Sequence, residues 1–370
     1  MRKRMLTLIK SEAVLIISSL AAVITMFFVP PDAQYIHYID IKVIVLLFCL
    51  MAVVQGFVKN GFFDVVSKKA LSLSDNSKTI SFILIMLVFF SAMFVTNDVA
   101  LITFVPLTFG ILGNIRQKSL IFTVVMETLA ANLGGMATPF GSPHNLFVYT
   151  YYHFSPLEFF KTVIPPAALG FIIISVIALV KRFGETAKPH SFTDEKMPIK
   201  PLVIYSVLFL ISVLGVLNVI PYYICLFVVL ITILIADRAV LKNVDYFLLI
   251  TFVAFFIFVG NLGRIDAVRE SISQVINGSE FFTGLILSQV ISNVPAAVML
   301  SGFTENSKAL LLGVNVGGLG TLVASLASLI SFKLYIKTEN SKPLQYILIF
   351  SVYNFAVMAA LVGFVFFAGV

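Results

Sequence analysis

The residues best suited to binding chemistry stand in the middle of an apolar run. The stretch from Ala130 to Tyr149 reads AANLGGMATPFGSPHNLFVY. It combines paired glycines and two prolines, which interrupt a helix, with asparagine, threonine, serine and histidine, which can bond to exposed backbone or to a ligand. Half-helices that end at such a break present N–H groups to anions and free carbonyls to cations. The stretch therefore predicts half of a binding site for a small ion or molecule.

A second copy of this pattern lies near the end of the chain. NLGGMAT at 132–138 corresponds to NVGGLGT at 315–321. Each copy follows a short polar tip, Thr96-Asn97-Asp98 in the first half and Ser292-Asn293 in the second. A single pair of glycines is more typical of helix packing or a kink. Four broken elements in two ordered pairs favour a transporter binding site instead.

From these two copies we expect the substrate- and ion-binding residues to lie at the tips and along the two broken helices. They are Thr96, Asn97, Asp98, Asn132, Gly134, Gly135, Thr138, Pro139, Gly141, Ser142, Asn145, Ser292, Asn293, Pro295, Asn315, Gly317, Gly318, Thr321 and Ser325. No catalytic residue is expected, because four scattered histidines and few intramembrane acids offer no nucleophile, base or metal cluster. We expect no cofactor, apart from a sodium ion if sodium couples transport.

Ionisable residues near these motifs allow more than one interpretation. Asp98 is a coupling candidate because it is ionisable at membrane depth, and a cap for its hairpin tip is the alternative. Glu127 is a second coupling candidate, as a proton or cation relay, or it belongs to a buried pair. His144 either borders the site or is a hydrogen-bonded structural residue. Lys333 is expected to extend to the cytoplasmic surface.

The composition is that of an integral membrane protein. Of 370 residues, 59% are hydrophobic and 12% are charged, where soluble domains carry about 25% charged residues. The net charge of +7 comes from basic residues at the ends of apolar runs, where they set topology, so nucleic-acid binding is discounted. Cys49 and Cys225 lie inside apolar segments and predict neither a disulfide nor a zinc site.

The positive-inside rule orders the apolar runs. Basic residues within 1–10 place the N-terminus in the cytoplasm, and the run after them is read as an uncleaved first helix. Segment 80–113 has basic residues at both ends and two arms too short to span, so it predicts a re-entrant hairpin open to the cytoplasm. Segment 280–303 predicts a second hairpin, entered from the exterior. The C-terminus is expected outside.

These segments define the expected organisation. The first inverted repeat covers 1–180 and contains hairpin 80–113 and broken helix 119–153. A cytoplasmic linker covers 181–200, and the second repeat covers 201–370 with hairpin 280–303 and broken helix 309–336. The amphipathic pieces 61–78 and 263–278 are read as interfacial helices before each hairpin. The predicted fold is an all-α polytopic membrane protein, an inverted repeat with two re-entrant helical hairpins and two broken transmembrane helices.

Four stretches carry a resemblance to a known superfamily: TNDVALITFVPLT, ANLGGMATPFGSPHNL, SQVISNVPAAVML and VNVGGLGTLVASLASLI. The chain resembles the ion transporter superfamily, which includes arsenite permeases, NhaD-type sodium/proton antiporters, citrate transporters and divalent anion:sodium symporters. It looks closest to arsenite-permease-like, citrate transporter-like inner-membrane proteins. The resemblance implies a homodimer whose moving domain carries the site. The third tip position is Asp98 in one copy and Val294 in the other, a departure that favours proton or cation coupling.

The predicted function is secondary active transport of a small anion or oxyanion across the inner membrane. We expect this transport to be coupled to a proton or sodium gradient and to use an elevator-type movement. The alternative is a sodium/proton antiporter that uses Asp98 and Glu127. A channel would not require paired inverted hairpins, and no P-loop indicates ATP coupling. The expected partners are the substrate, the coupling ion, membrane lipid and a second copy.

Overall fold

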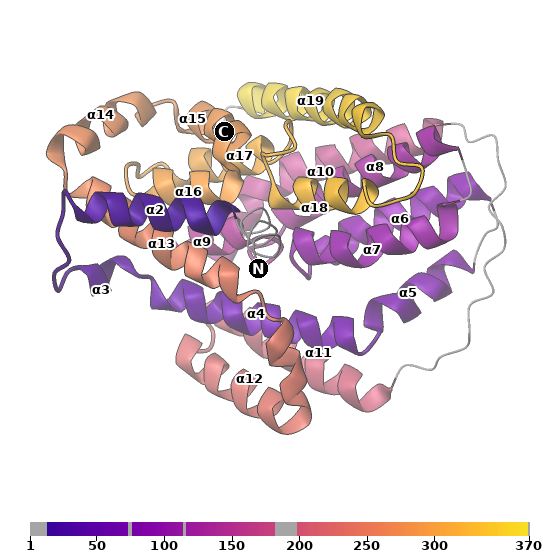
Figure 1. The fold of residues 1–370 in the computed structure, drawn as a ribbon, viewed down its shortest axis with the longest axis horizontal. Helices are drawn as coiled ribbons and strands as arrows, with labels where there is room; N and C mark the ends of the chain where they lie inside the picture. The colour runs from indigo at the N-terminus through magenta and orange to yellow at the C-terminus, as the bar shows by residue number, and fades with distance from the viewer. Residues whose placement is uncertain (1–12, 73–75, 114–115, 182–197, 369–370) are drawn as a thin grey trace.

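The computed structural model describes residues 13–72, 76–113, 116–181 and 198–368 (Figure 1). Within these ranges every regular element is a helix and no strand occurs. The basic residues 1–10 and most of the predicted linker 181–200 lie outside the described residues. The helices of the first half are α2 (Ala13–Met26), α3 (Tyr35–Tyr38), α4 (Ile41–Lys59), α5 (Phe62–Leu71), α6 (Ser77–Ala92), α7 (Asn97–Leu112), α8 (Gln117–Met136), α9 (Pro143–Tyr151) and α10 (Pro156–Val180).

The helices of the second half lie between residues 199 and 368. They are α11 (Ile199–Val216), α12 (Tyr222–Asp237), the 3-10 helix η1 (Arg238–Asn243), α13 (Tyr246–Gly263), α14 (Asp266–Ile276), α15 (Glu280–Ile291), α16 (Asn293–Ser301), α17 (Ser307–Gly317), α18 (Leu326–Tyr335) and α19 (Pro343–Ala368). In the part of the chain that is described, seven helices are long and apolar enough to cross a membrane. The prediction of an all-helical, multi-pass membrane protein is confirmed.

Local sequence explains where several helices begin. Asp40, Ser155 and Asp245 precede α4, α10 and α13, and each side chain accepts the N–H group three residues further on, at 3.0, 3.2 and 3.0 Å. Such caps satisfy N–H groups that have no partner within the helix. Proline at the first position of α9 and α10 fixes a helical φ where no donor is needed.

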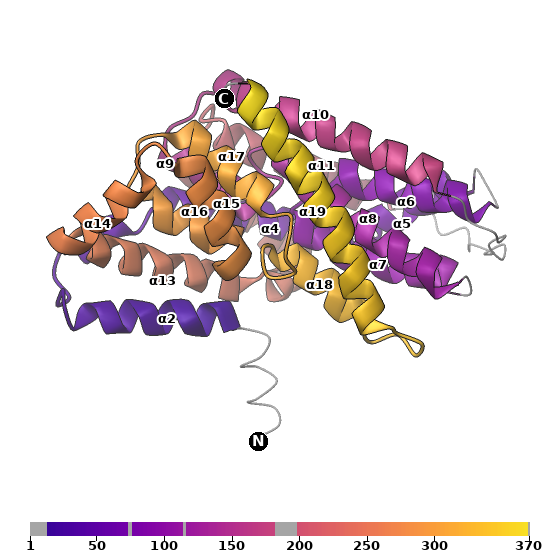
Figure 2. The ribbon, with the colours of Figure 1, turned by 90° about the horizontal axis from the view of Figure 1, so that it is seen from above.

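The helices form two packed sets. We call α6–α9 and α15–α18 the core bundle, and α2, α4, α11, α12 and α13 the flanking layer. Within the flanking layer, α4 packs against α11 and α12, and α2 packs against α13. Figure 1 shows α4, α11 and α12 along the lower edge of the molecule, with α15, α17 and α19 along the upper edge. In Figure 2, α19 runs diagonally past both halves of the core bundle.

The two halves of the core bundle exchange their last helices. In the first half α6 and α7 pack on α8, and in the second half α15 and α16 pack on α17. The helix that follows each break crosses to the other half, because α9 packs against α16 and α17 whereas α18 packs against α7 and α8. The two non-helical breaks, 137–142 and 318–325, are therefore held inside the bundle by helices from both halves.

Glycines permit the closest helix contacts in each half. A methyl group on Gly134 in α8 would lie 2.1 Å from the Phe89 carbonyl oxygen of α6. On Gly313 in α17 it would lie 2.3 Å from the Phe281 carbonyl oxygen of α15. These neighbours are backbone atoms and cannot rotate away, so the packing requires glycine at both positions.

Replacing Gly134 by alanine should lower the free energy of unfolding by about 1–3 kcal/mol, because overpacking forces backbone apart. Gly110→Ala in α7 is the matched control, since nothing lies within 4 Å of an added methyl group there and alanine is favoured in helices. Thermal unfolding in detergent compares the two variants. Equal melting temperatures would contradict the close contact between α6 and α8.

Candidate functional site

Each polar tip is tied to the break of its own half by the same kind of backbone bond. At the first tip the Asn97 N–H group donates to the Gly141 carbonyl at 3.0 Å. At the second tip the Asn293 N–H group donates to the Ala324 carbonyl at 2.9 Å. Both bonds use a donor at the start of a helix, which has no partner within that helix. The tips and the breaks are therefore neighbours.

Two threonines, one in each break, also form matching bonds to the chain near the tip of their own half. The Thr138 hydroxyl donates to the Met93 carbonyl at 2.7 Å, just before the first tip. The Thr321 hydroxyl donates to the Gln289 carbonyl at 3.0 Å, just before the second. Each hydroxyl proton is thus used to hold the chain that enters a tip. The structure gives these two predicted binding residues an anchoring role.

One cluster of side chains centres on Asn132 of α8. Its amide oxygen accepts hydrogen bonds from the Asn97 amide and from the Ser325 hydroxyl, both at 3.0 Å. Its amide nitrogen donates to the Ser328 hydroxyl at 3.4 Å. Asn132 is 7% exposed, so the cluster joins the first tip to the start of α18 inside the protein.

A second cluster centres on Asn315 of α17. Its amide nitrogen donates to the Asn145 oxygen at 2.7 Å and to the Leu311 carbonyl at 2.9 Å. Its amide oxygen lies 3.1 Å from His144 Nε2. Because an amide oxygen only accepts, Nε2 carries the proton and His144 is the donor. This cluster joins α17 to the start of α9, just as the Asn132 cluster joins α8 to α18.

Each break also has an amide side chain that satisfies its exposed carbonyls. Asn145 donates to the Gly135, Met136 and Thr138 carbonyls at 3.0–3.1 Å. In the second half Gln289 donates to the Gly317 and Leu319 carbonyls and accepts from the Thr321 N–H group. Carbonyls freed by a broken helix require such partners in an apolar interior.

The second tip contains an unusual backbone conformation. Ser292 has φ 77° and ψ 153°, a region that residues other than glycine rarely adopt. Holding it there costs about 1–3 kcal/mol, which the surrounding structure must offset. The first tip differs, since Thr96 is extended at φ −61° and ψ 146°. Such strain is concentrated at functional sites, so the second tip is a binding candidate on geometry alone.

A cavity of about 410 Å³ lies where the two tips face the flanking layer. The first tip contributes Thr96 and Asp98, and the second contributes Ser292, Val294 and Pro295. Residues of α2, α4 and α13 form the opposite wall. The volume falls within the range of about 300–1,000 Å³ that is typical of small-molecule sites.

One face of α18 also lines this cavity. Leu326, Leu329, Ile330 and Lys333 follow the spacing of a single helix face. The sequence predicts Lys333 only as a surface lysine, and the structure adds its position on the cavity wall. Within the described residues Lys333 forms no ion pair.

The cavity is lined by a few charged residues, and both signs of charge are present. Asp98 and Asp245 carry the acidic groups of its lining, and Lys333 carries the positive charge. The Asp245 carboxylate accepts the Leu248 N–H group as a helix cap. Asp98 has no side-chain hydrogen bond with another described residue, so its carboxyl group is available to an ion or a proton.

Glu127 occupies a different place. It is fully buried in α8, where one carboxyl oxygen accepts the Thr108 hydroxyl of α7. The other oxygen has no partner among the described residues. Glu127 does not line the cavity, which separates the two acidic coupling candidates.

The structure sorts the predicted binding residues into two groups. Thr96, Asp98, Ser292 and Pro295 line the cavity. The others lie behind its wall, in or beside the tips and breaks: Asn97, Asn132, Gly134, Gly135, Thr138, Pro139, Gly141, Ser142, Asn145, Asn293, Asn315, Gly317, Gly318, Thr321 and Ser325. Sequence reasoning missed Lys333, Gln289 and Ser328. Of these three, only Gln289 could have been noticed in the sequence, because it is a polar residue in a short apolar arm.

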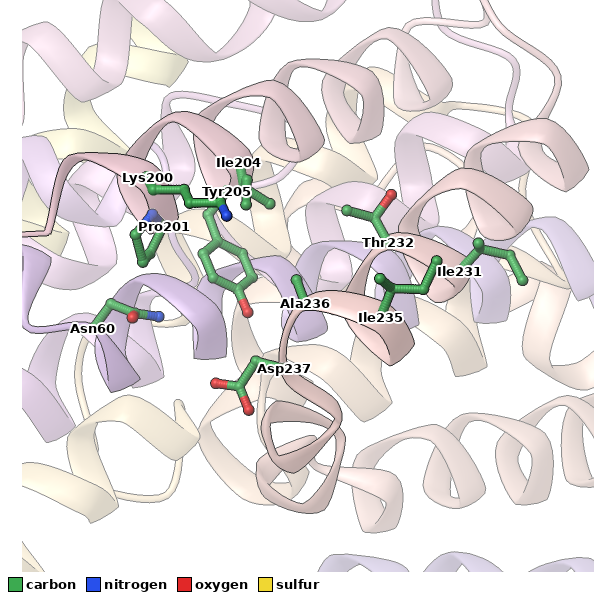
Figure 3. A pocket seen from close by; sticks show the side chains of 10 residues that line it. All are labelled: Asn60, Lys200, Pro201, Ile204, Tyr205, Ile231, Thr232, Ile235, Ala236 and Asp237. Carbon is green, nitrogen blue, oxygen red and sulfur yellow. The ribbon is translucent and has the colours of Figure 1, made fainter.

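A larger cavity of about 570 Å³ lies elsewhere, at the ends of α4, α11 and α12 (Figure 3). None of the predicted binding residues lines it. The cavity at the tips remains the candidate substrate site because it combines both tips, the strained Ser292 and three charged residues.

Comparison with known proteins supports a transport role. Residues 5–309 match the citrate transporter family. An uncharacterized transporter of Methanocaldococcus jannaschii is 33% identical over 303 residues, which cover 81% of this chain and 83% of that protein. The inner membrane protein YbiR of Escherichia coli is 31% identical over 314 residues, 83% of this chain and 84% of that protein. The P protein of Mus musculus is 27% identical over 135 residues, 36% of this chain and 16% of that protein.

Asn145→Ala should destabilise the protein by about 4 kcal/mol or more, because three carbonyls and Asn315 lose their partner and each unsatisfied buried group costs about 1–3 kcal/mol. Thr150→Val in the same helix is the control. The Thr150 hydroxyl is buried without a partner among the described residues, so its removal should leave stability unchanged or raise it. Thermal unfolding of both variants checks this, and an unaffected Asn145 variant would show that the first break needs no such donor.

Proposed function

Because the chain belongs to the citrate transporter family of the ion transporter superfamily, we propose that it is a secondary active transporter of a small anion or oxyanion. This is a family of membrane transporters and not of enzymes. The observation that carries the proposal is the cavity between the two tips and the flanking layer. Citrate is the first substrate to test, because the family is named for it.

The cavity offers the groups that an anion needs. Lys333 supplies a positive charge, and Thr96 and Ser292 supply hydroxyl donors from opposite halves of the chain. An anion that leaves water requires a charged or hydrogen-bonded partner, because an unpaired buried charge is costly. Lys333 has no ion pair with a described residue, so its charge is available.

Asp98 is the coupling residue in this proposal. It shares the cavity with Lys333, whereas Glu127 is bonded to Thr108 outside it. A carboxylate that shares the cavity with the lysine competes with an anionic substrate for the same positive charge. Proton or cation binding at Asp98 would remove that competition, which links the coupling ion to substrate binding.

The proposed mechanism is an elevator movement of the core bundle against the flanking layer. The Asn132 and Asn315 clusters, Asn145 and Gln289 all bond within the core bundle, which supports its movement as one body. The matching bonds at Asn97 and Asn293 and at Thr138 and Thr321 support an inverted repeat whose α6–α7 and α15–α16 pairs are re-entrant hairpins.

The same proposal includes orientation and assembly. Basic residues such as Lys59, Lys78 and Lys118 support an orientation with the N-terminus and the first hairpin's ends in the cytoplasm and the C-terminus outside. The protein would act in the inner membrane as a homodimer. This topology does not depend on the identity of the substrate.

Sodium/proton antiport is the second candidate, favoured by the two carboxylates Asp98 and Asp245 in one cavity. Purified protein in vesicles separates the two functions. An anion transporter accumulates citrate or another carboxylate or oxyanion under a proton or sodium gradient. An antiporter exchanges sodium for protons with no anion added. Thermal-shift screening identifies the substrate first, since ligand at a hundredfold excess over Kd stabilises the native state by about 2.7 kcal/mol.

Lys333→Met should weaken binding of the anion identified in this way by about tenfold or more, because a hydrogen bond to a charged group contributes about 1.5–3 kcal/mol. Lys333→Arg keeps the charge and should retain most of the binding. Titration of both variants by thermal shift measures the effect. Unchanged affinity in the Met variant would remove Lys333 from the site.

Asp98→Asn should abolish gradient-driven accumulation while substrate binding, and with it exchange, is retained. Asparagine keeps the shape and hydrogen bonding of the tip but cannot titrate or carry charge. If Asp98 has only a structural role at the tip, asparagine of the same shape fills its place and driven transport stays normal. Uptake against pH and counterflow are measured side by side in vesicles. Accumulation that matches the parent protein and follows pH in the same way would rule out coupling at Asp98.

A further inference from the structure

The cavity at the ends of α4, α11 and α12 has the features of a second binding site (Figure 3). Its polar residues include Asn60, Lys200, Tyr205 and Asp237. Figure 3 shows the Tyr205 ring extending from α11 toward the part of the cavity that carries Asn60 and Asp237. The transport site uses none of these residues.

The charged residues place this cavity at the boundary between membrane and water. Lys59 ends α4, Lys200 lies in the first turn of α11, and Asp237 ends α12. These three helices are among those long and apolar enough to span. Since charged residues at the ends of spanning helices lie at the interface, the cavity is at the depth of lipid head groups.

The cavity has one positive charge without a partner. Lys59 forms an ion pair with Asp237 at 2.6 Å, and these two charges cancel. Lys200 is exposed and forms no ion pair within the described residues. The net charge of the three residues is therefore positive, which suits an anion with a single negative charge.

A buried hydroxyl on the cavity wall also lacks a partner. Tyr205 is 2% exposed, yet its hydroxyl forms no hydrogen bond with any described residue. The ring packs tightly on α4, where a methyl group on Gly56 would lie 2.0 Å from it. A buried polar group without a partner is costly, and a ligand in the cavity would supply one.

The walls around these polar groups are apolar and continue into the membrane. Ile204 and Ile235 border the cavity, and Ile235 is 82% exposed on the outer face of α12. One turn beyond Tyr205, Phe209 lines a second, apolar cavity of about 330 Å³ together with Phe57 and Phe94. Phe57 contacts both Tyr205 and Phe209 at ring distances of 6.1 and 6.4 Å.

We propose that this seam along α11 binds a phospholipid, with the phosphodiester held by Lys200 and the Tyr205 hydroxyl and an acyl chain along the phenylalanine-lined cavity. A phosphodiester carries a single negative charge, which would pair with the unpartnered positive charge of Lys200. The phenylalanine-lined cavity favours a lipid over a free phosphate, because a soluble ion has no acyl chain to place there. The acyl chain would contact Phe94, next to the first tip, and Phe209 of the flanking layer.

Native mass spectrometry of the purified, delipidated full chain tests this site with three probes. Phosphatidylglycerol has both parts of the proposed ligand, diacylglycerol lacks the phosphate, and sn-glycerol 3-phosphate lacks the chains. Only phosphatidylglycerol should bind tightly. Lys200→Gln should weaken its binding about tenfold, the effect of losing a hydrogen bond to a charged group. Lys161→Gln, at an exposed lysine of α10, should not change it.

Tyr205→Phe keeps the ring that packs on Gly56 and removes only the hydroxyl. It should weaken phosphatidylglycerol binding several-fold without lowering the melting temperature of the delipidated protein, and it tests the site even if the Lys200 variant folds poorly. Equal binding of sn-glycerol 3-phosphate would mean a soluble phosphate site, and equal binding of diacylglycerol would mean that the phosphate is not recognised. Either result, or phosphatidylglycerol binding unchanged in both variants, would overturn the proposal.

Discussion

The need to satisfy broken backbone inside an apolar protein governs the arrangement of this fold. Two helices stop at 137–142 and 318–325 within the bundle, so the backbone groups freed there need other hydrogen-bond partners. Asn145 and Gln289 each donate to several of the freed carbonyls, and the tip asparagines donate backbone N–H groups to two more. Two amide side chains thus satisfy most of the freed carbonyls, and the two backbone N–H bonds fix where the tips lie.

The cavity follows from this bonding. Asn97 bonds to Asn132 and Asn315 bonds to Asn145 behind the wall. The polar residues of the core bundle that line the cavity are Thr96, Asp98, Ser292 and Lys333. The wall that a substrate would meet is therefore held by a rigid layer of hydrogen bonds, which keeps its few polar groups in place. Helices α9 and α18, exchanged between halves, pack each tip's hairpin against a helix of the other half.

Much of this was predictable from periodicity and polarity. The apolar runs gave the helices, and the repeated NLGGMAT and NVGGLGT motifs identified the breaks. The sequence could not separate a residue that lines the cavity from one that holds the wall, because Asn97 and Asp98 are adjacent and equally polar. It also missed Lys333, whose place depends on how α18 packs on α7, a contact between distant segments that no local pattern encodes. The inverted repeat and the binding roles stay predictions.

Protection of the cavity by bound anion tests the central claim most directly. Ile330→Cys places a thiol on the α18 face of the cavity, and Thr232→Cys places one in the separate cavity of α11 and α12. The native cysteines, Cys49 and Cys225, are buried and give little background. A transported anion should slow labelling of the Ile330 variant by a charged thiol reagent and leave the Thr232 variant unaffected. Equal labelling of the Ile330 variant with and without that anion, in protein that still transports it, would contradict a substrate site between the tips and the flanking layer.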